Sequence, residues 1–175
     1  ISPTDASSKD ALSQHAASPY RDDQSHEHNK PVTSQEDYSK LSSLNILLAE
    51  DNIVNQKVAS RILNKMGLTP QIANNGLEAL EKVREQSFDI IFMDIQMPEM
   101  DGLTATKEIR KIFSPHEAPV IIAMTANAME SDKEACMQAG MDDFIAKPVK
   151  KELIKEKIGY WYSELRRSRS SSNSS

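Results

Sequence analysis

The sequence predicts a doubly wound α/β fold, in which five parallel strands form one sheet that is covered by helices on both faces. Two observations lead to this prediction. Short apolar runs alternate along the chain with longer stretches in which apolar residues recur at helical spacing, five times in succession. The short runs are also apolar almost throughout, which is typical of strands buried on both faces of a parallel sheet.

The five predicted strands are short segments rich in β-branched, leucine and aromatic side chains. In chain order they are "LNILLA", "TPQIA", "FDIIFM", "PVIIAM" and "DDFIA". Each is followed by a stretch of helical spacing, so the connection can cross the sheet and return the next strand parallel to the last.

Five helices are predicted from this periodicity. The first is expected between Asn52, a favourable N-terminal cap, and Gly67, which favours a helix end. The apolar residues that mark the five helices are, in order, Val54, Val58, Ile62 and Met66; Leu77, Leu80 and Val83; Leu103, Ile109, Ile112 and Phe113; Met129, Cys136 and Ala139; and Ile154, Ile158, Trp161 and Leu165.

Composition places the folded domain at residues 43–166. Residues 1–42 are rich in Ser, Asp, Gln, His and Pro and have few large apolar side chains, so we expect a disordered or linker segment. Residues 167–175 form a Ser/Arg-rich tail of low complexity that we also expect to be disordered.

Charge and hydropathy exclude several classes of protein. The net charge of −5 argues against nucleic-acid binding. No apolar run approaches the roughly 20 residues that span a bilayer, so we expect no membrane contact by this segment. The single cysteine, Cys136, excludes an internal disulfide and fits a cytoplasmic location, although a longer parent chain could be anchored in a membrane.

Polar residues follow the predicted strands at the points where the strands end. Chemistry in open α/β sheets gathers at the carboxyl ends of the strands, and in the flavodoxin-like order 2-1-3-4-5 strands 1, 3, 4 and 5 are neighbours. An aspartate after one strand is often only a turn former, but we expect the three carboxylates, the hydroxyl and the ammonium group that end strands 1, 3, 4 and 5 to face a single crevice. The strand-end residues are Glu50 and Asp51, Asn74 and Asn75, Asp94, Thr125, and Lys147.

Three carboxylates in one crevice repel one another unless a cation joins them. Mg²⁺ prefers oxygen ligands and is usually held by one or two carboxylates together with a phosphate. We expect Asp51 and Asp94 as direct ligands, Glu50 acting through water, and the backbone carbonyl of Gln96 as a further ligand.

The same crevice suits phosphoryl transfer. Asp94 is a candidate nucleophile, because carboxylates can form aspartyl-phosphate intermediates. Lys147 offers an ammonium group and Thr125 a hydroxyl donor to the oxygens of the transferred group.

Four separated motifs, taken together, resemble the receiver domain of two-component response regulators. They are "ILLAEDN", "FDIIFMDIQMPEMDG", "PVIIAMTA" and "DDFIAKP", and the resemblance covers about residues 44–165. The motifs "EDN..NQ" and "MDIQMPEMDG" are most similar to those of receivers fused to hybrid sensor histidine kinases. Little chain follows Leu165, which favours the C-terminal receiver of such a kinase over a transcription factor.

The resemblance implies a phosphorelay function. Asp94 would accept a phosphoryl group from a phosphohistidine of a histidine kinase domain, with Mg²⁺ at Glu50 and Asp51, and the group would then pass to a histidine phosphotransfer protein. The domain would catalyse no reaction beyond its own phosphorylation and dephosphorylation, although the parent chain could be a hybrid kinase.

The resemblance also implies a conformational switch. Thr125 would move toward the phosphate and Phe144 would reorient, although Phe144 fits an ordinary core position equally well. Gln96 and Asn127 lie where side chains tune the lifetime of the acyl phosphate, and the peptide before Pro148 would be cis. Glu50 departs from the family's commoner Asp, and Phe144 stands where some members have Tyr.

Two other functions remain alternatives. A Mg²⁺-dependent phosphatase of the haloacid dehalogenase type also uses an aspartate nucleophile at a strand end, but it needs a second Asp two residues later, where this chain has Gln96. A pseudo-receiver that only binds partners would not need the whole set of Glu50, Asp51, Thr125 and Lys147.

Overall fold

The computed structural model describes residues 35–127 and 129–172, which belong to the unit formed by residues 31–175. Of the linker expected at residues 1–42, residues 1–34 lie outside the described residues. The last three residues of the expected tail, 173–175, also lie outside them. Among the described helices, none combines the length and the apolar character needed to cross a membrane.

Five parallel strands form one sheet in the order β2-β1-β3-β4-β5, which confirms the predicted topology. The strands are β1 (Ile46–Ala49), β2 (Gln71–Ala73), β3 (Ile90–Asp94), β4 (Val120–Thr125) and β5 (Asp143–Ala146). In the register of the sheet, Ala49 lies beside Met93, Asp94 beside Met124, and Thr125 beside Ala146. The residues that end β1, β3, β4 and β5 consequently meet along one edge.

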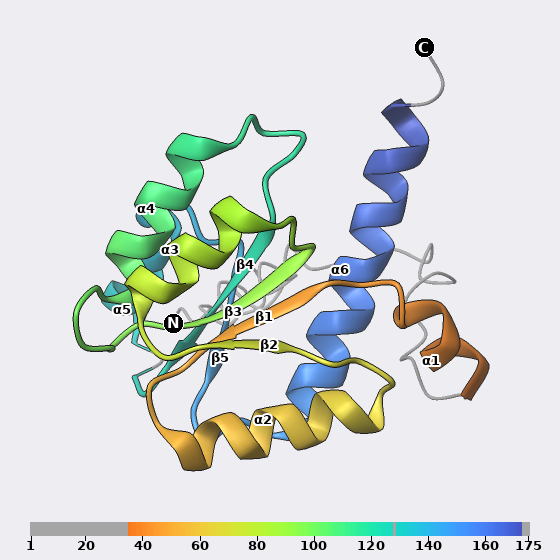
Figure 1. Ribbon diagram of the computed structural model, residues 1–175, viewed down its shortest axis with the longest axis horizontal. Coiled ribbons are helices and arrows are strands. Elements are labelled where there is room, and N and C mark those ends of the chain that lie inside the picture. The colour runs from red at the N-terminus through yellow and green to blue at the C-terminus, as the bar shows by residue number, and fades with distance from the viewer. Residues whose placement is uncertain (1–34, 128, 173–175) are drawn as a thin grey trace, which may run out of the picture. The chain divides into compact units, whose positions relative to one another are not determined.

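Helices cover both faces of this sheet (Figure 1). The helices are α1 (Gln35–Leu41), α2 (Ile53–Lys65), α3 (Gly76–Glu85), α4 (Gly102–Ile112), α5 (Glu130–Ala139) and α6 (Lys151–Ser172). Residues of α2 and α6 pack in one apolar cluster with one face of the sheet, and residues of α3, α4 and α5 pack in a second cluster with the other.

Alternate residues of each central strand enter different clusters. Ile46 and Leu48 of β1 face α2 and α6, whereas Leu47 and Ala49 face the other three helices. All residues of β1, β3 and β4 are buried, as the continuous apolar runs predict. The core therefore fixes the strand ends rigidly in place.

The first predicted helix begins and ends as expected, but its apolar stripe is buried only in part. The Asn52 side chain accepts a hydrogen bond from the backbone N–H of Asn55, and Gly67 follows the helix with a φ of +83°. Val54 and Val58, however, are 67% and 45% exposed. A spacing of four residues rotates the stripe by about 40° at each step around a helix, so it cannot stay on one face.

Helical structure extends beyond both expected limits of the domain. A sixth helix, α1, lies within residues 1–42, and it forms because Leu41 is fully buried in the cluster of α2 and α6. α6 continues through Ser172, six residues past the expected end at 166, where a disordered tail was expected. Arg169 pairs there with Asp89, and the hydroxyls of Ser171 and Ser172 bond to carbonyls of the preceding turn.

Candidate functional site

The edge of the sheet at the carboxyl ends of its strands carries buried polar residues. Glu50 directly follows β1, and its exposed fraction is 2%. Asp94 and Thr125 are the last residues of β3 and β4 and are 4% and 5% exposed. Among the described residues, the other buried polar side chain is Thr106, whose hydroxyl is satisfied by the carbonyl of Gly102 within α4. Buried polar groups thus concentrate at this edge.

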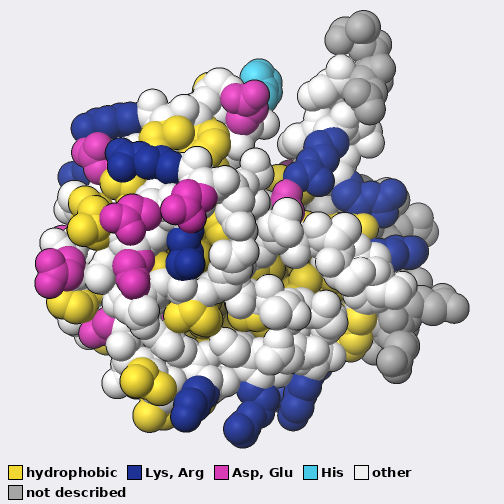
Figure 2. All heavy atoms as spheres, viewed as in Figure 1, with side chains coloured by type: hydrophobic (Ala, Val, Ile, Leu, Met, Phe, Trp, Pro, Cys, Tyr) yellow, Lys and Arg dark blue, Asp and Glu magenta, His cyan; other side chains and the backbone are white. Residues whose placement is uncertain are grey.

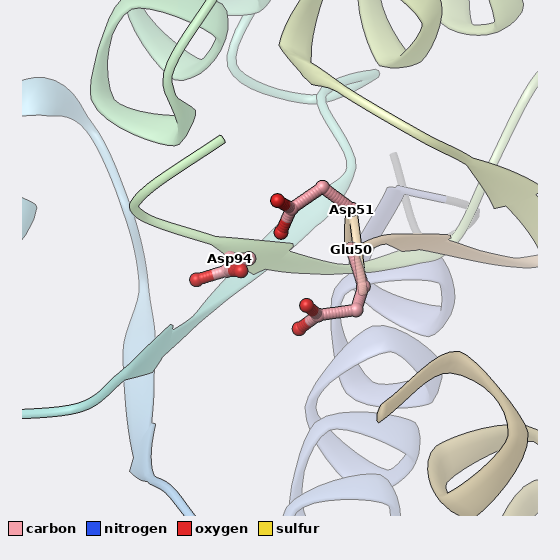
Figure 3. A group of neighbouring side chains, drawn as sticks. All are labelled: Glu50, Asp51 and Asp94. Atoms are coloured by element: carbon pink, nitrogen blue, oxygen red, sulfur yellow. The ribbon is translucent and has the colours of Figure 1, made fainter. Parts of the chain in front are cut away.

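Three carboxylates meet at this edge. Glu50 and Asp51 extend from the end of β1 and Asp94 from the end of the neighbouring β3, into the same space (Figure 3). One oxygen from each of the three lies within 4.8 Å of the others. Asp51 is exposed, whereas Glu50 and Asp94 are buried, so the cluster opens to solvent on one side.

Lys147, directly after β5, reaches the cluster from across the sheet. Its ammonium nitrogen lies 2.9 Å from the Oδ2 of Asp94 and 3.1 Å from the Oε2 of Glu50. The peptide bond between Lys147 and Pro148 is cis, as the family resemblance implies. One ammonium group therefore bridges the two buried carboxylates.

Burial and charge shift the pKa values of both partners. Burial, together with the nearby charge of Glu50, raises the pKa of Asp94 from its ordinary 3.8 to about 6, against the opposing effect of Lys147. Burial lowers the pKa of Lys147, but the hydrogen bonds and charges of Asp94 and Glu50 outweigh it, so the pKa of Lys147 is raised. A single ammonium group thus leaves negative charge at the site incompletely neutralised.

The Glu50 carboxylate is held by donors at the start of α2, from its N-cap residue Asn52 and its first turn, as well as by Lys147. Its Oε1 accepts from the backbone N–H of Asn52 at 3.1 Å and from the side-chain amide of Asn55 at 3.4 Å. The side chain of Gln56 donates to the Glu50 carbonyl and to the amide oxygen of Asn74. The connection from β1 to α2 is therefore tied to the site at several points.

Thr125, Asn127 and Gln96 lie around the opening of the cluster. The Thr125 hydroxyl donates to the Asn127 carbonyl at 2.7 Å and accepts from the Asn127 backbone N–H at 3.1 Å. The backbone N–H of Gln96 donates to the Oδ1 of Asp94 at 3.3 Å. In this state the Thr125 hydroxyl is bound to its own loop rather than turned toward Asp94.

The strand-end residues of β1, β3, β4 and β5 that the sequence singles out line a pocket of about 260 Å³, whereas Asn74 at the end of β2 lies outside it and bonds to Gln56 and Glu78. Asn75 lies outside it, because its side chain caps α3 by accepting from the N–H of Glu78. Phe144 lies outside it as well, packed against the cluster of α3, α4 and α5. The lining residues are Glu50, Asp51, Asn52, Asn55, Asp94, Ile95, Gln96, Thr125, Ala126, Asn127, Asp132 and Lys147.

Two polar lining residues, Asn55 and Asp132, are neither among the predicted strand-end and site residues nor among the predicted helix caps. Both reach the pocket from the first turn of a helix, Asn55 from α2 and Asp132 from α5. Polar side chains at the start of a helix that follows a strand end are the signal that could have found them.

The residues present suit a hard divalent cation. Carboxylate oxygens from Glu50, Asp51 and Asp94 are of the kind that Mg²⁺ prefers, and they already lie close enough to share one ion. The position of Lys147 against two of these carboxylates shows that a positive charge is accommodated there.

Comparisons with known proteins agree with this geometry. The family model of the response regulator receiver domain matches residues 46–159. Hybrid signal transduction histidine kinase B of Dictyostelium discoideum is 47% identical over 115 residues, which are 60% of this chain and 6% of that protein. The osmosensing histidine protein kinase SLN1 of Saccharomyces cerevisiae is 40% identical over 133 residues, which are 73% of this chain and 11% of that protein. The chain thus spans about a tenth or less of the length of these relatives.

Two solved receiver domains are similar in structure as well as in sequence. The receiver domain of the sensor histidine kinase PA1611 from Pseudomonas aeruginosa, solved with magnesium in its active-site cleft, is 39% identical with a TM-score of 0.63, covering 69% of this chain and 98% of that one. The receiver domain of Ssk1 from Saccharomyces cerevisiae, solved with the phosphotransfer protein Ypd1, is 31% identical with a TM-score of 0.64, covering 67% and 88%. The chain belongs to the response regulator receiver domain family of two-component systems.

Proposed function

We propose that this receiver domain accepts a phosphoryl group on Asp94 from a phosphohistidine, with Mg²⁺ bound at Glu50, Asp51 and Asp94. The observation that carries the proposal is the cluster itself, in which three carboxylates and one ammonium group face a pocket at the end of the sheet. Asp51 and Asp94 would hold the ion directly, Glu50 through water, and the Gln96 carbonyl would add a ligand. When bound, Mg²⁺ neutralises negative charge on the incoming phosphoryl group.

Asp94 is the nucleophile in this proposal. A carboxylate oxygen of Asp94 forms the new bond to phosphorus while the bond from phosphorus to the donor imidazole nitrogen breaks, and that bonding pair stays on the imidazole. Lys147 already lies 2.9 Å from Asp94, so its ammonium group is placed to stabilise charge on the phosphoryl oxygens.

Thr125 and Phe144 form the proposed switch. A turn of the Thr125 hydroxyl toward the phosphoryl group would break its hydrogen bonds to Asn127 and move the loop before α5. The centroid of the Phe144 ring lies 4.6 Å from the ammonium nitrogen of Lys133 on α5 and 5.9 Å from that of Lys157 on α6. A new position of this ring would therefore be transmitted to both helices.

Gln96 and Asn127 are proposed to set the lifetime of the acyl phosphate. Both line the pocket that contains Asp94, and in this proposal their side chains limit the approach of water to the acyl phosphate. Gln96 also stands where a phosphatase of the haloacid dehalogenase type needs its second aspartate, which supports a slowly hydrolysed signalling state over rapid turnover.

The proposed partners are a histidine kinase domain and a histidine phosphotransfer protein, in the cytoplasm. Exposed apolar side chains support a protein partner, because Ile53, Val54 and Val58 lie on α2 at the edge of the site and are 63%, 67% and 45% exposed. Figure 2 shows hydrophobic side chains next to Lys and Arg along the lower edge of this view, over α2. The hybrid kinases among the relatives support a hybrid kinase as the parent chain.

Phosphate labelling tests the proposal. We expect Mg²⁺ and a phosphorylated histidine phosphotransfer protein to label the wild-type chain, and Asp94→Asn to lower the label to background. Asp89→Asn is a matched control, because Asp89 precedes the same strand at its other end and contacts Asn45 and Arg169 instead. A label that persists in Asp94→Asn would overturn the assignment of the acceptor.

A further inference from the structure

Asn55 contacts Glu50, whose side chain is longer than the Asp that is commoner at this position of the family. Its side-chain amide donates to the Oε1 of Glu50 at 3.4 Å, while Lys147 holds the other oxygen, Oε2, at 3.1 Å. The Asn52 backbone N–H is the third donor, at 3.1 Å from Oε1. The Glu50 carboxylate is thus fixed from two opposite sides.

Glu50 needs such a restraint because its side chain has one more rotatable bond than that of aspartate. An unrestrained glutamate would spend part of its time in rotamers that turn its carboxylate away from the ion site. The side chain is 2% exposed, so both of its oxygens need polar partners within the protein. The donors of Asn52 and Asn55 meet this need at Oε1, and the Lys147 ammonium group meets it at Oε2.

We propose that Asn55 is a positioning residue for the metal site, which holds the Glu50 carboxylate in the orientation that a divalent cation requires. This inference rests on the proposed function, because it assigns Asn55 a role at the proposed Mg²⁺ site. Hydrogen-bond partners around a metal site act in this way generally, because they fix the groups that face the ion, whether these bind it directly or, as proposed for Glu50, through water.

A structural role for the Asn55 side chain is small by comparison. The residue is exposed, and the hydrogen bond that starts α2 uses its backbone N–H, which donates to the Asn52 side chain at 3.1 Å. Alanine at position 55 keeps that backbone donor, and alanine favours helix formation. Asn55→Ala should therefore fold with wild-type stability while losing one donor to Glu50.

Binding of Mg²⁺ and Mn²⁺ to the full chain, measured by titration calorimetry, tests the inference without any phosphoryl transfer. We expect Asn55→Ala to weaken the affinity for both ions about tenfold, at the lower end of the range for partners of metal ligands. Asn64→Ala is the matched control, because Asn64 is an exposed asparagine of the same helix that lies outside the pocket. It should leave the affinity unchanged.

A double-mutant cycle with Glu50→Asp separates positioning from other effects. The wild-type contact is already 3.4 Å long, so we expect an aspartate carboxylate, which is one methylene shorter, to lose it, and Asn55→Ala should then change the ion affinity by less than about twofold in that background. Equal losses in the wild-type and Glu50→Asp backgrounds would overturn the inference, as would an unchanged affinity in Asn55→Ala alone. A wild-type chain that binds neither ion would instead overturn the proposed metal site, and the inference with it.

Discussion

The two ends of the sheet carry charges in different ways. At the amino end, Asp89 accepts from the Asn45 backbone N–H at 2.8 Å and pairs with Arg169. Asp142 accepts from Arg110 at 2.7 Å and from the Ile121 backbone N–H at 2.9 Å. Each of these carboxylates has its own arginine and its own backbone donor.

At the carboxyl end the carboxylates outnumber the cations. Glu50, Asp51 and Asp94 lie together, and among the described residues only Lys147 pairs with any of them. The pKa of Asp94 is raised to about 6 as a result of burial and of the charge on Glu50. At the amino end, groups of the chain itself pair with both carboxylates, and these pairs stabilise the fold. At the carboxyl end, negative charge remains that a bound cation can neutralise.

The largest expected effect is on stability, from Arg110→Ala at the amino end. The Arg110 guanidinium donates to the carbonyls of Gly140 and Pro119, each at 2.7 Å, as well as to Asp142. Its removal leaves two partly buried carbonyls and the exposed Asp142 carboxylate without this donor, so we expect a loss of about 2 to 3 kcal/mol in the free energy of unfolding. Urea denaturation measures this loss.

Ion binding in the same variant sharpens the comparison. Arg110→Ala should keep wild-type affinity for Mg²⁺, because Arg110 lies outside the pocket of the acid cluster. Lys111→Ala is the matched control for stability, since Lys111 is exposed and forms a surface pair with Glu108 worth no more than about 0.5 kcal/mol. A large loss of ion affinity in Arg110→Ala would show that the two ends are not independent.

A smaller and opposite effect is expected at the carboxyl end, from Asp94→Asn without Mg²⁺. Because the pKa of Asp94 is raised from 3.8 to about 6 on folding, its contribution to stability is present below pH 4 and is lost as the pH rises through 6. Asparagine carries no charge to desolvate, so at pH 7.5 the variant should be more stable than the wild type. After allowance for the weakened contact with Lys147, we expect a gain of about 1 to 2 kcal/mol.

The pH dependence of this gain is the decisive measurement. Urea denaturation of both chains between pH 4 and 8, with a chelator present, should show the difference shrinking as the pH falls through about 6. With saturating Mg²⁺ the wild type should recover stability and the variant much less, because the ion has lost one carboxylate. A constant difference at all pH values would contradict the excess of negative charge at this end.

The fold and the central site residues were predictable because each depends on a local pattern. The run "IIFMD" is apolar up to its final carboxylate, and all five of its residues are buried. Parallel strands end at the same edge, so Glu50, Asp94, Thr125 and Lys147 could be placed together from their positions at strand ends alone. The pocket brings together all four.

The parts that were not predicted depend on the direction of side chains or on packing between residues far apart in the sequence. Asn55 and Asp132 lie in the first turns of their helices, and whether their side chains line the pocket depends on the direction of each helix after the strand before it. The helical turns of α1 and of residues 167–172 look unfavourable in composition, but burial of Leu41 and pairing of Arg169 with Asp89 stabilise them. Contacts between residues as far apart as 89 and 169 leave no periodic signal in the sequence.

The smallest effect is expected from Arg169→Ala, which separates strong from weak charge pairs within the amino end. The Arg169 side chain is 66% exposed, so its pair with Asp89 is screened by solvent and salt. Asp89 keeps the hydrogen bond from the Asn45 backbone N–H when the arginine is removed. We expect a loss of about 0.5 kcal/mol or less in the free energy of unfolding, measured by urea denaturation at low salt and absent at about 1 M salt. A loss as large as that of Arg110→Ala would mean that the pair of Arg169 with Asp89 couples the last turns of α6 to the cooperative core.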